Sequence, residues 1–109
     1  MNAIDHTFSA LADPVRRAIL IQLAKGEATV GELAAPFDIS LPAISRHLKV
    51  LEQASLISNE RDGKHRRCRL KPEALAAAAG WLDFHRRFWI GSLERLDAHL
   101  KRNPKEKKT

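Results

Sequence analysis

Apolar and polar residues follow each other along this chain with the three- to four-residue spacing of amphipathic helices, most clearly over residues 40–52. Ser40 is a suitable N-cap for this stretch, because its hydroxyl can accept a hydrogen bond from a free N–H of the first turn. Pro42 is tolerated there, since first-turn N–H groups have no helical partner. We therefore expect a helix with one buried stripe, which consists of Ile44, Leu48 and Leu51.

The same pattern and its interruptions predict the other helices. Asp13 followed by Pro14 is a helix start, and Gly26 is a fitting stop. Thr29 and Glu32 have the spacing of a capping box, in which each side chain satisfies a backbone N–H of the other residue. Besides 40–52, the expected helices cover residues 4–11, 14–25, 29–35 and 72–101.

Two of these helices, 29–35 and 40–52, are joined by a short turn, which is the arrangement of a helix-turn-helix. The exposed residues at the start of the second helix are small or polar, and basic residues follow them. A helix with such a narrow leading end can enter the major groove of DNA. The alternative is an ordinary surface helix with scattered cations.

A cationic hairpin is expected next. Asp62-Gly63 lies between two extended runs, and Asp-Gly in that setting is a strong hairpin signal. Six Lys or Arg residues fall between Arg61 and Lys71. After a helix-turn-helix, such a hairpin is a wing that can follow DNA phosphates or enter the minor groove. The alternative is a solvated edge hairpin kept soluble by its charge. The predicted fold is mainly α with a small β-hairpin, a winged helix-turn-helix.

The charge distribution favours a polyanionic partner. The formal net charge is +6, of which residues 40–71 carry +5 and residues 101–109 carry +4, while the remaining parts are slightly acidic. A localised basic footprint suits nucleic acid. RNA is less suitable than DNA, since no aromatic residues are interleaved with the basic ones to stack on bases. The alternative is a winged helix that contacts protein instead of DNA. A salt-dependent affinity for DNA would discriminate these two functions.

Length and composition bound the remaining classes. The 109 residues predict one domain over 1–101 and a disordered basic tail over 102–109. We expect a cytoplasmic chain, because the sequence shows no signal-peptide pattern and no apolar run near the ~20 residues of a membrane span. No enzyme activity or cofactor is expected, because Ser45 and His47 cannot face each other on a helix and no Gly-rich phosphate loop is present.

The last helix is too apolar for the surface of a small domain. Together with the first helix it is expected to pack against a second copy of the chain. The residues predicted at this dimer interface are Phe8, Leu11, Trp81, Leu82, Phe88, Trp89, Leu93, Leu96 and Leu100.

Several stretches resemble the ArsR/SmtB family of small winged-helix repressors. The stretches that carry the resemblance are ALADPVRRAILIQLAKGEATVGELA, SLPAISRHLKVLEQASLI and the basic hairpin RDGKHRRCRL. They span roughly residues 8–70 in the family's order and spacing. The segment WLDFHRRFWIGSLERLDAHL looks like that of members that lack a metal site.

The resemblance implies a homodimer that represses transcription from a palindromic double-stranded operator, with an inducer that is unknown. The residues expected to face bases are Pro42, Ser45 and Arg46, with His47 beside them. The residues expected to contact mainly phosphate are Ser40, Lys49, Arg61, Lys64, His65, Arg66 and Arg67.

Many members of this family release DNA on binding a metal. At the two positions of the family's Cys-x-Cys site, this chain has Thr29 and Gly31. Neither is a ligand for soft metals, so a thiolate site is not expected.

A second family site is matched in part by Asp83, His85 and His99, and Leu96 replaces the missing ligand. A zinc-sensing repressor with this reduced site is the alternative to a member without metal, in which these residues are solvated or interface polar groups. The single cysteine, Cys68, could be a redox sensor if neighbouring arginines stabilise its thiolate. A lone cysteine in a strand is more often a small buried apolar residue.

Overall fold

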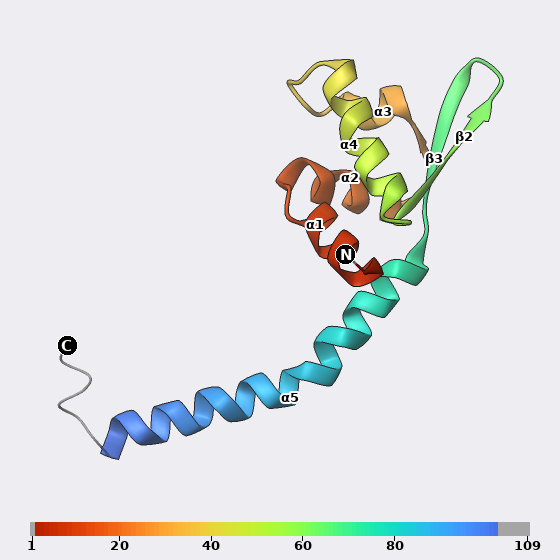
Figure 1. Cartoon of the computed structure of the whole chain (residues 1–109). Helices are drawn as coiled ribbons and strands as arrows, with labels where there is room; N and C mark the ends of the chain where they lie inside the picture. Colours follow the sequence, from red (N-terminus) through yellow and green to blue (C-terminus); the bar gives the residue numbers. More distant parts are fainter. Residues whose placement is uncertain (1, 103–109) are drawn as a thin grey trace. The chain divides into compact units, whose positions relative to one another are not determined.

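The computed structural model describes residues 2–102, and its contacts divide the chain into two units, Met1–Ala78 and a second that begins at Ala79 (Figure 1). The helices are α1 (Ala3–Leu11), α2 (Pro14–Ala24), α3 (Val30–Ala34), α4 (Leu41–Gln53) and α5 (Pro72–Arg102). The strands are β1 (Ala28–Thr29), β2 (Ile57–Asp62) and β3 (His65–Leu70). All five predicted helices and the hairpin are confirmed. Arg102 belongs to α5, and the rest of the predicted tail lies outside the described residues.

The helix starts follow the capping signals of the sequence. The Asp13 carboxylate accepts hydrogen bonds from the N–H groups of Val15 (2.8 Å) and Arg16 (3.1 Å) at the start of α2. Burial opposes ionisation of Asp13, yet these N–H groups and the charge of Arg16 outweigh it and lower the pKa of the carboxyl. Ser40 caps α4 by accepting from the N–H of Ala43. These caps fix where each helix begins.

The sheet contains one strand that the sequence pattern does not predict. Its order is β1-β3-β2, all antiparallel, with Ala28 opposite Cys68 and Thr29 opposite Arg67. β1 has only two residues, too few to show an alternating pattern. In the hairpin, Asp62 still pairs with His65. The turn is therefore Gly63-Lys64, one residue later than predicted, with Gly63 in the left-handed conformation (φ +63°).

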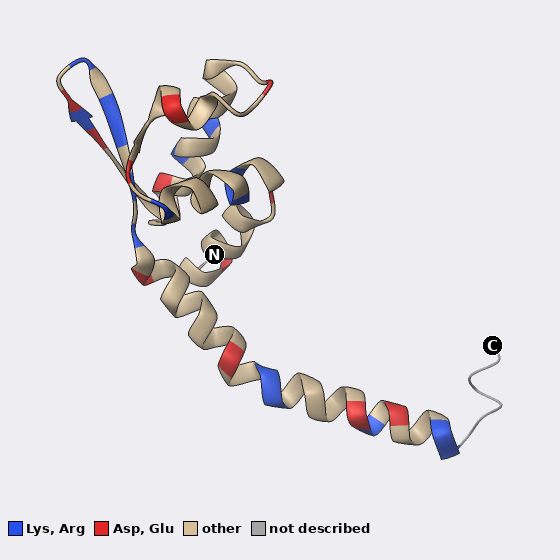
Figure 2. Ribbon diagram, turned by 180° about the vertical axis from the view of Figure 1, so that it is seen from behind, with Lys and Arg blue, Asp and Glu red and all other residues tan. Residues whose placement is uncertain are grey.

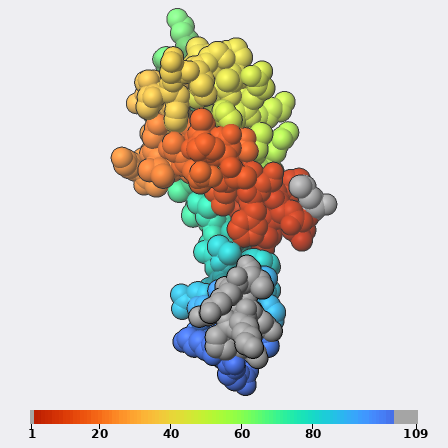
Figure 3. Space-filling view, turned by 90° about the vertical axis from the view of Figure 1, so that its left-hand side faces the viewer, coloured from red at the N-terminus to blue at the C-terminus, as the bar shows by residue number. Residues whose placement is uncertain are grey.

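The core of the first unit lies between α2, α3, α4 and the sheet. The predicted α4 stripe is buried, with exposed fractions of 0–1%. Figure 3 shows the residues of α1 and α2, in red and orange, against those of α4. Each fully buried Leu or Ile stabilises the fold by about 1.5–3 kcal/mol relative to exposure. The largest fully buried side chains are Ile19, Leu33, Ile44, Leu48, Leu51, Leu56, Ile57 and Cys68.

The part of α5 beyond Ala78 is a single helix with a broad exposed apolar surface. Its exposed large side chains are Trp81, Leu82, Phe84, Phe88, Trp89, Ile90, Leu93 and Leu96. Within the described residues, no helix is long and apolar enough to cross a membrane.

Candidate nucleic-acid interface

The leading end of α4 presents an uncovered polar surface. Burial of Ile44 and Leu48 on one side turns the intervening residues outward, so Pro42, Ser45 and Arg46 are all exposed. Leu41, the first residue of the helix, is 58% exposed. The surface is therefore narrow at the helix start and basic one turn later, as the sequence predicts.

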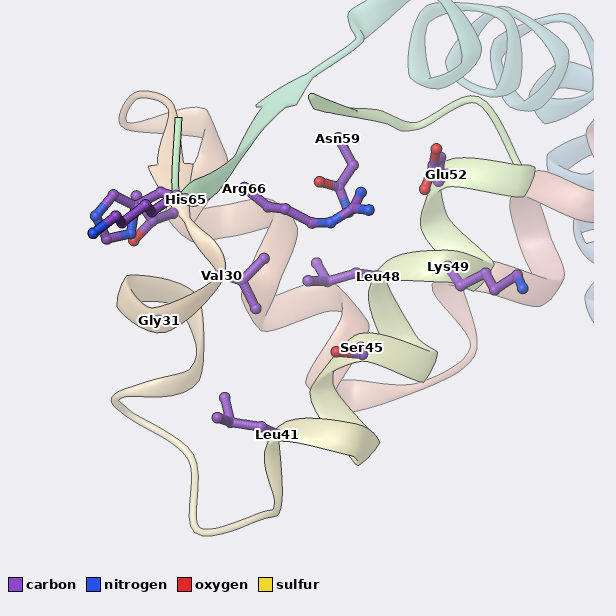
Figure 4. Close-up of a pocket in the computed structure, with 12 residues that line it drawn as sticks. Val30, Gly31, Leu41, Ser45, Leu48, Lys49, Glu52, Asn59, His65 and Arg66 are labelled. Carbon is purple, nitrogen blue, oxygen red and sulfur yellow. The ribbon is translucent and has the colours of Figure 1, made fainter. Parts of the chain in front are cut away.

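A groove of about 560 Å³ separates this helix from the hairpin. Ser45 and Lys49 line it from α4, and Lys64, His65 and Arg66 line it from the hairpin (Figure 4). Eight of the predicted DNA-contacting positions are exposed around this groove or on the surfaces beside it: Ser40, Pro42, Ser45, Arg46, Lys49, Lys64, His65 and Arg66. The structure thus brings together residues that lie up to 26 positions apart in the sequence.

The cations of the hairpin fall into two groups. Within the part of the chain that the structure describes, no ion pair involves Arg61, Lys64 or Arg66, and all three are exposed. Arg67, in contrast, lies 3.2 Å from Asp62 and 3.4 Å from Glu27. Figure 2 shows blue basic and red acidic segments along the ribbon of the hairpin. The first group is therefore available for an outside anion, whereas Arg67 already has two.

A second arginine is held at the base of the hairpin. Arg69 forms an ion pair with Glu27, which thus joins two residues of β3 to the segment before β1. Sequence reasoning missed Glu27, because its 40-residue separation from Arg67 leaves no local signal.

His47 points away from the groove. Its side chain is only 21% exposed, and its Nδ1 atom lies 3.3 Å from Nη1 of Arg16 and 3.9 Å from the Asp13 carboxylate. The sequence predicts His47 as a neighbour of the base-facing residues, and the structure instead places it against α2.

Comparisons with known proteins decide the family. Residues 11–58 match the model of a helix-turn-helix domain. The chain is 46% identical over 89 residues to the HTH-type transcriptional regulator Rv2034 of Mycobacterium tuberculosis, covering 82% of this chain and 80% of that protein. It is 39% identical over 79 residues to the transcriptional repressor SdpR of Bacillus subtilis, covering 72% and 88% of the two chains.

The solved structures agree. A crystal structure titled as an ArsR family transcriptional regulator matches with a TM-score of 0.76 and 40% identity, over 80% of this chain and 90% of that one. The chain belongs to the ArsR/SmtB family of transcriptional regulators. This confirms the predicted family and the winged helix-turn-helix fold class, and the family is one of regulators rather than enzymes.

The candidate metal ligands Asp83, His85 and His99 all lie on α5. Here His85 packs on the Trp81 ring at 4.2 Å, and its Nδ1 lies 2.8 Å from the Trp81 carbonyl oxygen. Among the described residues of one chain, no three His, Cys, Asp or Glu side chains are grouped closely enough to hold a metal. The predicted candidates Asp83, His85 and His99 therefore form no such group within one copy.

Cys68 is an interior residue of this ArsR/SmtB chain. It is fully buried, and burial, followed by the charge of Glu52, raises the pKa of its thiol despite the opposing charge of Arg66. A raised pKa disfavours the reactive thiolate, so the redox-sensor alternative loses its physical basis.

Proposed function

We propose that this protein is a cytoplasmic homodimeric repressor that binds a palindromic operator in its own promoter. The observation that carries the proposal is the uncovered leading end of α4 beside the hairpin cations that form no ion pair within residues 2–102. A helix of this kind enters the major groove, while cations beside it follow the phosphates. Bound there, the protein would exclude polymerase from the promoter.

The contacts divide by chemistry. Arg46 can donate two hydrogen bonds to the O6 and N7 atoms of a guanine, and Ser45 can donate to or accept from any base edge. Pro42 contributes apolar contact. The phosphate contacts are assigned to exposed groups near the groove or on the hairpin: Ser40, Lys49, Arg61, Lys64, His65 and Arg66. Arg67 is assigned to holding the hairpin, because Asp62 and Glu27 already neutralise it.

The dimer is argued from the apolar surface of α5. α5 exposes many large apolar side chains, among them Phe88 (61% exposed) and Trp89 (59% exposed). An apolar surface of this extent marks a site of protein–protein contact. Phe8 and Leu11 of α1 are half-buried, and we assign them to the same proposed dimer interface. Two copies related by a twofold axis would place their α4 helices about 34 Å apart, in successive major grooves.

Fluorescence anisotropy tests the proposal, with wild-type protein on DNA from its own upstream region and on scrambled DNA of equal length. Arg46→Ala should weaken operator binding and reduce discrimination by about 1–3 kcal/mol, as expected for loss of a bidentate base contact. Lys71→Ala is the matched control, since Lys71 is exposed at the opposite end of β3 from the turn. Equal binding to both DNAs, or no binding, would refute the proposal.

A zinc arm tests the alternative of a metal-sensing repressor. The anisotropy titration is repeated in chelator and in excess zinc, with His85→Ala beside the wild type. Binding indifferent to zinc supports the metal-free repressor. Release of DNA by zinc that His85→Ala abolishes would show a reduced metal site between copies of α5.

A further inference from the structure

We infer that Arg16 and His47 are positioning residues that set the rotation of α4 for operator recognition. The inference rests on the proposed DNA binding and deepens it, because it moves His47 from the DNA-contacting set to a tether inside the protein. The tether joins three helices, with Arg16 on α2, His47 on α4, and the last turn of α1.

The Arg16 guanidinium makes all the connections. Its Nε–H donates to the carbonyl of Ala10 (2.7 Å), and Nη2 donates to the carbonyl of Ser9 (3.3 Å). Carbonyls in the last turn of a helix have few intrahelical partners, so they are natural acceptors for a cation. The remaining nitrogen, Nη1, lies 3.3 Å from Nδ1 of His47. One side chain therefore ties the end of α1 to the middle of α4.

The contact with Arg16 decides the tautomer of His47. A guanidinium only donates, so Nδ1 of His47 must be unprotonated to accept, which leaves the hydrogen on Nε2. The alternative partner of Nδ1 is Asp13, at 3.9 Å beyond hydrogen-bond distance, and its Oδ1 already accepts from Val15 and Arg16. The geometry thus favours a neutral imidazole that accepts from Arg16.

Such a bond adds a directional constraint to the rotation of α4 that the buried stripe already sets. Packing of Ile44, Leu48 and Leu51 holds α4 against the core, but apolar contact is not directional. A hydrogen bond from a fixed guanidinium is directional. Arg46 and His47 are adjacent on α4, about 100° apart around the helix axis. A small rotation of α4 at His47 therefore also changes the direction of the Arg46 side chain relative to base edges. Because α1 belongs to the proposed dimer surface, the same bond relates the interface to the reading helix.

The chain offers matched variants for a test. His47→Gln keeps an acceptor for Arg16, whereas His47→Phe keeps the ring and removes the acceptor. Arg16→Ala removes the whole tether. Arg17→Ala is the control, because Arg17 also donates to a carbonyl of α1, that of Leu11 (2.8 Å), and among the described residues it forms no side-chain hydrogen bond to α4. Each variant is measured by anisotropy on operator and scrambled DNA at several salt concentrations, together with its thermal unfolding.

Loss of the tether should weaken operator binding by about tenfold in His47→Phe and Arg16→Ala, the size expected for one hydrogen bond to a charged group. Binding to scrambled DNA and the salt slope should stay unchanged, because no phosphate contact is lost. The double variant should be no weaker than Arg16→Ala, and His47→Gln and Arg17→Ala should stay within about twofold of wild type.

Three results would overturn the inference. They are additive losses of affinity in the double variant, failure of His47→Gln to keep the wild-type affinity, and a smaller salt slope in His47→Phe, which would make His47 a phosphate contact.

Nitrogen NMR of the His47 ring gives a readout that needs no DNA. The free protein should show the Nε2–H tautomer with a hydrogen-bonded Nδ1, and Arg16→Ala should shift the Nδ1 resonance because that hydrogen bond is lost. A wild type that shows this tautomer yet binds no DNA would refute the proposed function and leave the tether itself standing.

Discussion

Removal of one hairpin cation should change how DNA affinity depends on salt, and the change should depend on whether that cation is already paired. Lys64 lies in the hairpin turn, is exposed, and has no ion pair among the described residues. Arg67, three residues later, is held by two carboxylates. Lys64→Ala and Arg67→Ala remove the same formal charge from one hairpin, so they form a matched pair.

The expected size follows from counterion release. Each phosphate neutralised by the protein contributes about 0.9 to the slope of log affinity against log salt. A homodimer loses two Lys64 side chains, so the slope should become shallower by about 1.8. Between 50 and 200 mM salt, the wild type should therefore lose about 12 times more affinity than Lys64→Ala. Arg67→Ala should change the slope by less than half as much, because Asp62 and Glu27 already compensate its charge.

The assay is an anisotropy titration of both variants and wild type on operator DNA at four or more salt concentrations. Lys64→Ala should weaken binding to operator and scrambled DNA alike, since a phosphate contact does not depend on sequence. Equal slopes for the two variants would show that the ion pairs of Arg67 do not govern its availability. A change of sequence preference alone in Lys64→Ala would place Lys64 on bases and refute the division of the hairpin into paired and unpaired cations.

Four further outcomes are expected. Leu48→Ala should lower the free energy of unfolding by about 2–5 kcal/mol in denaturant titrations, because it opens a cavity under α4. Asp13→Asn keeps the helix cap but cannot ionise. The folded protein lowers the pKa of Asp13, so the ionised carboxylate stabilises the fold. The wild type should therefore have a higher free energy of unfolding than Asp13→Asn above about pH 4, and this difference should vanish on acidification. Leu93→Asp places a charge on the exposed apolar surface of α5, so it should give monomers in sedimentation velocity and weaken operator binding. A wild type that is itself monomeric would exclude the proposed dimer. Cys68 should react with a thiol reagent only on unfolding, because it is fully buried.

Helix starts were predictable because capping is a local interaction. Asp13, Ser40 and the Thr29–Glu32 pair each act on N–H groups two or three residues away, so a single short window contains the whole signal. The buried stripe of α4 was predictable for a similar reason, since helical periodicity fixes which residues share a face. These features gave the fold class and the groove-facing residues.

The unpredicted features depend on partners distant in the sequence. Periodicity places His47 at the boundary between exposed Arg46 and buried Leu48, and only the position of Arg16, 31 residues earlier, decides its direction. In the same way, the sequence presents Arg67 as one more exposed cation. Its availability is decided by Glu27, which folding brings beside it. Charge counts therefore overestimate the cations that can bind DNA.

The hairpin and the helix-turn-helix are joined at one residue, and this has a consequence for recognition. Thr29 pairs with Arg67 in the sheet, while its hydroxyl accepts from the N–H of Glu32 to begin α3. The end of β1 and the start of α3 therefore share a position, which fixes the hairpin relative to the helices before DNA is bound. In the family resemblance drawn from the sequence, the Cys-x-Cys metal site falls on Thr29 and Gly31 of this chain. A residue committed to both a sheet pair and a helix cap serves the geometry of the reading surface, and its side chain oxygen is already engaged. In this chain that position contributes to preorganisation of the DNA-binding surface.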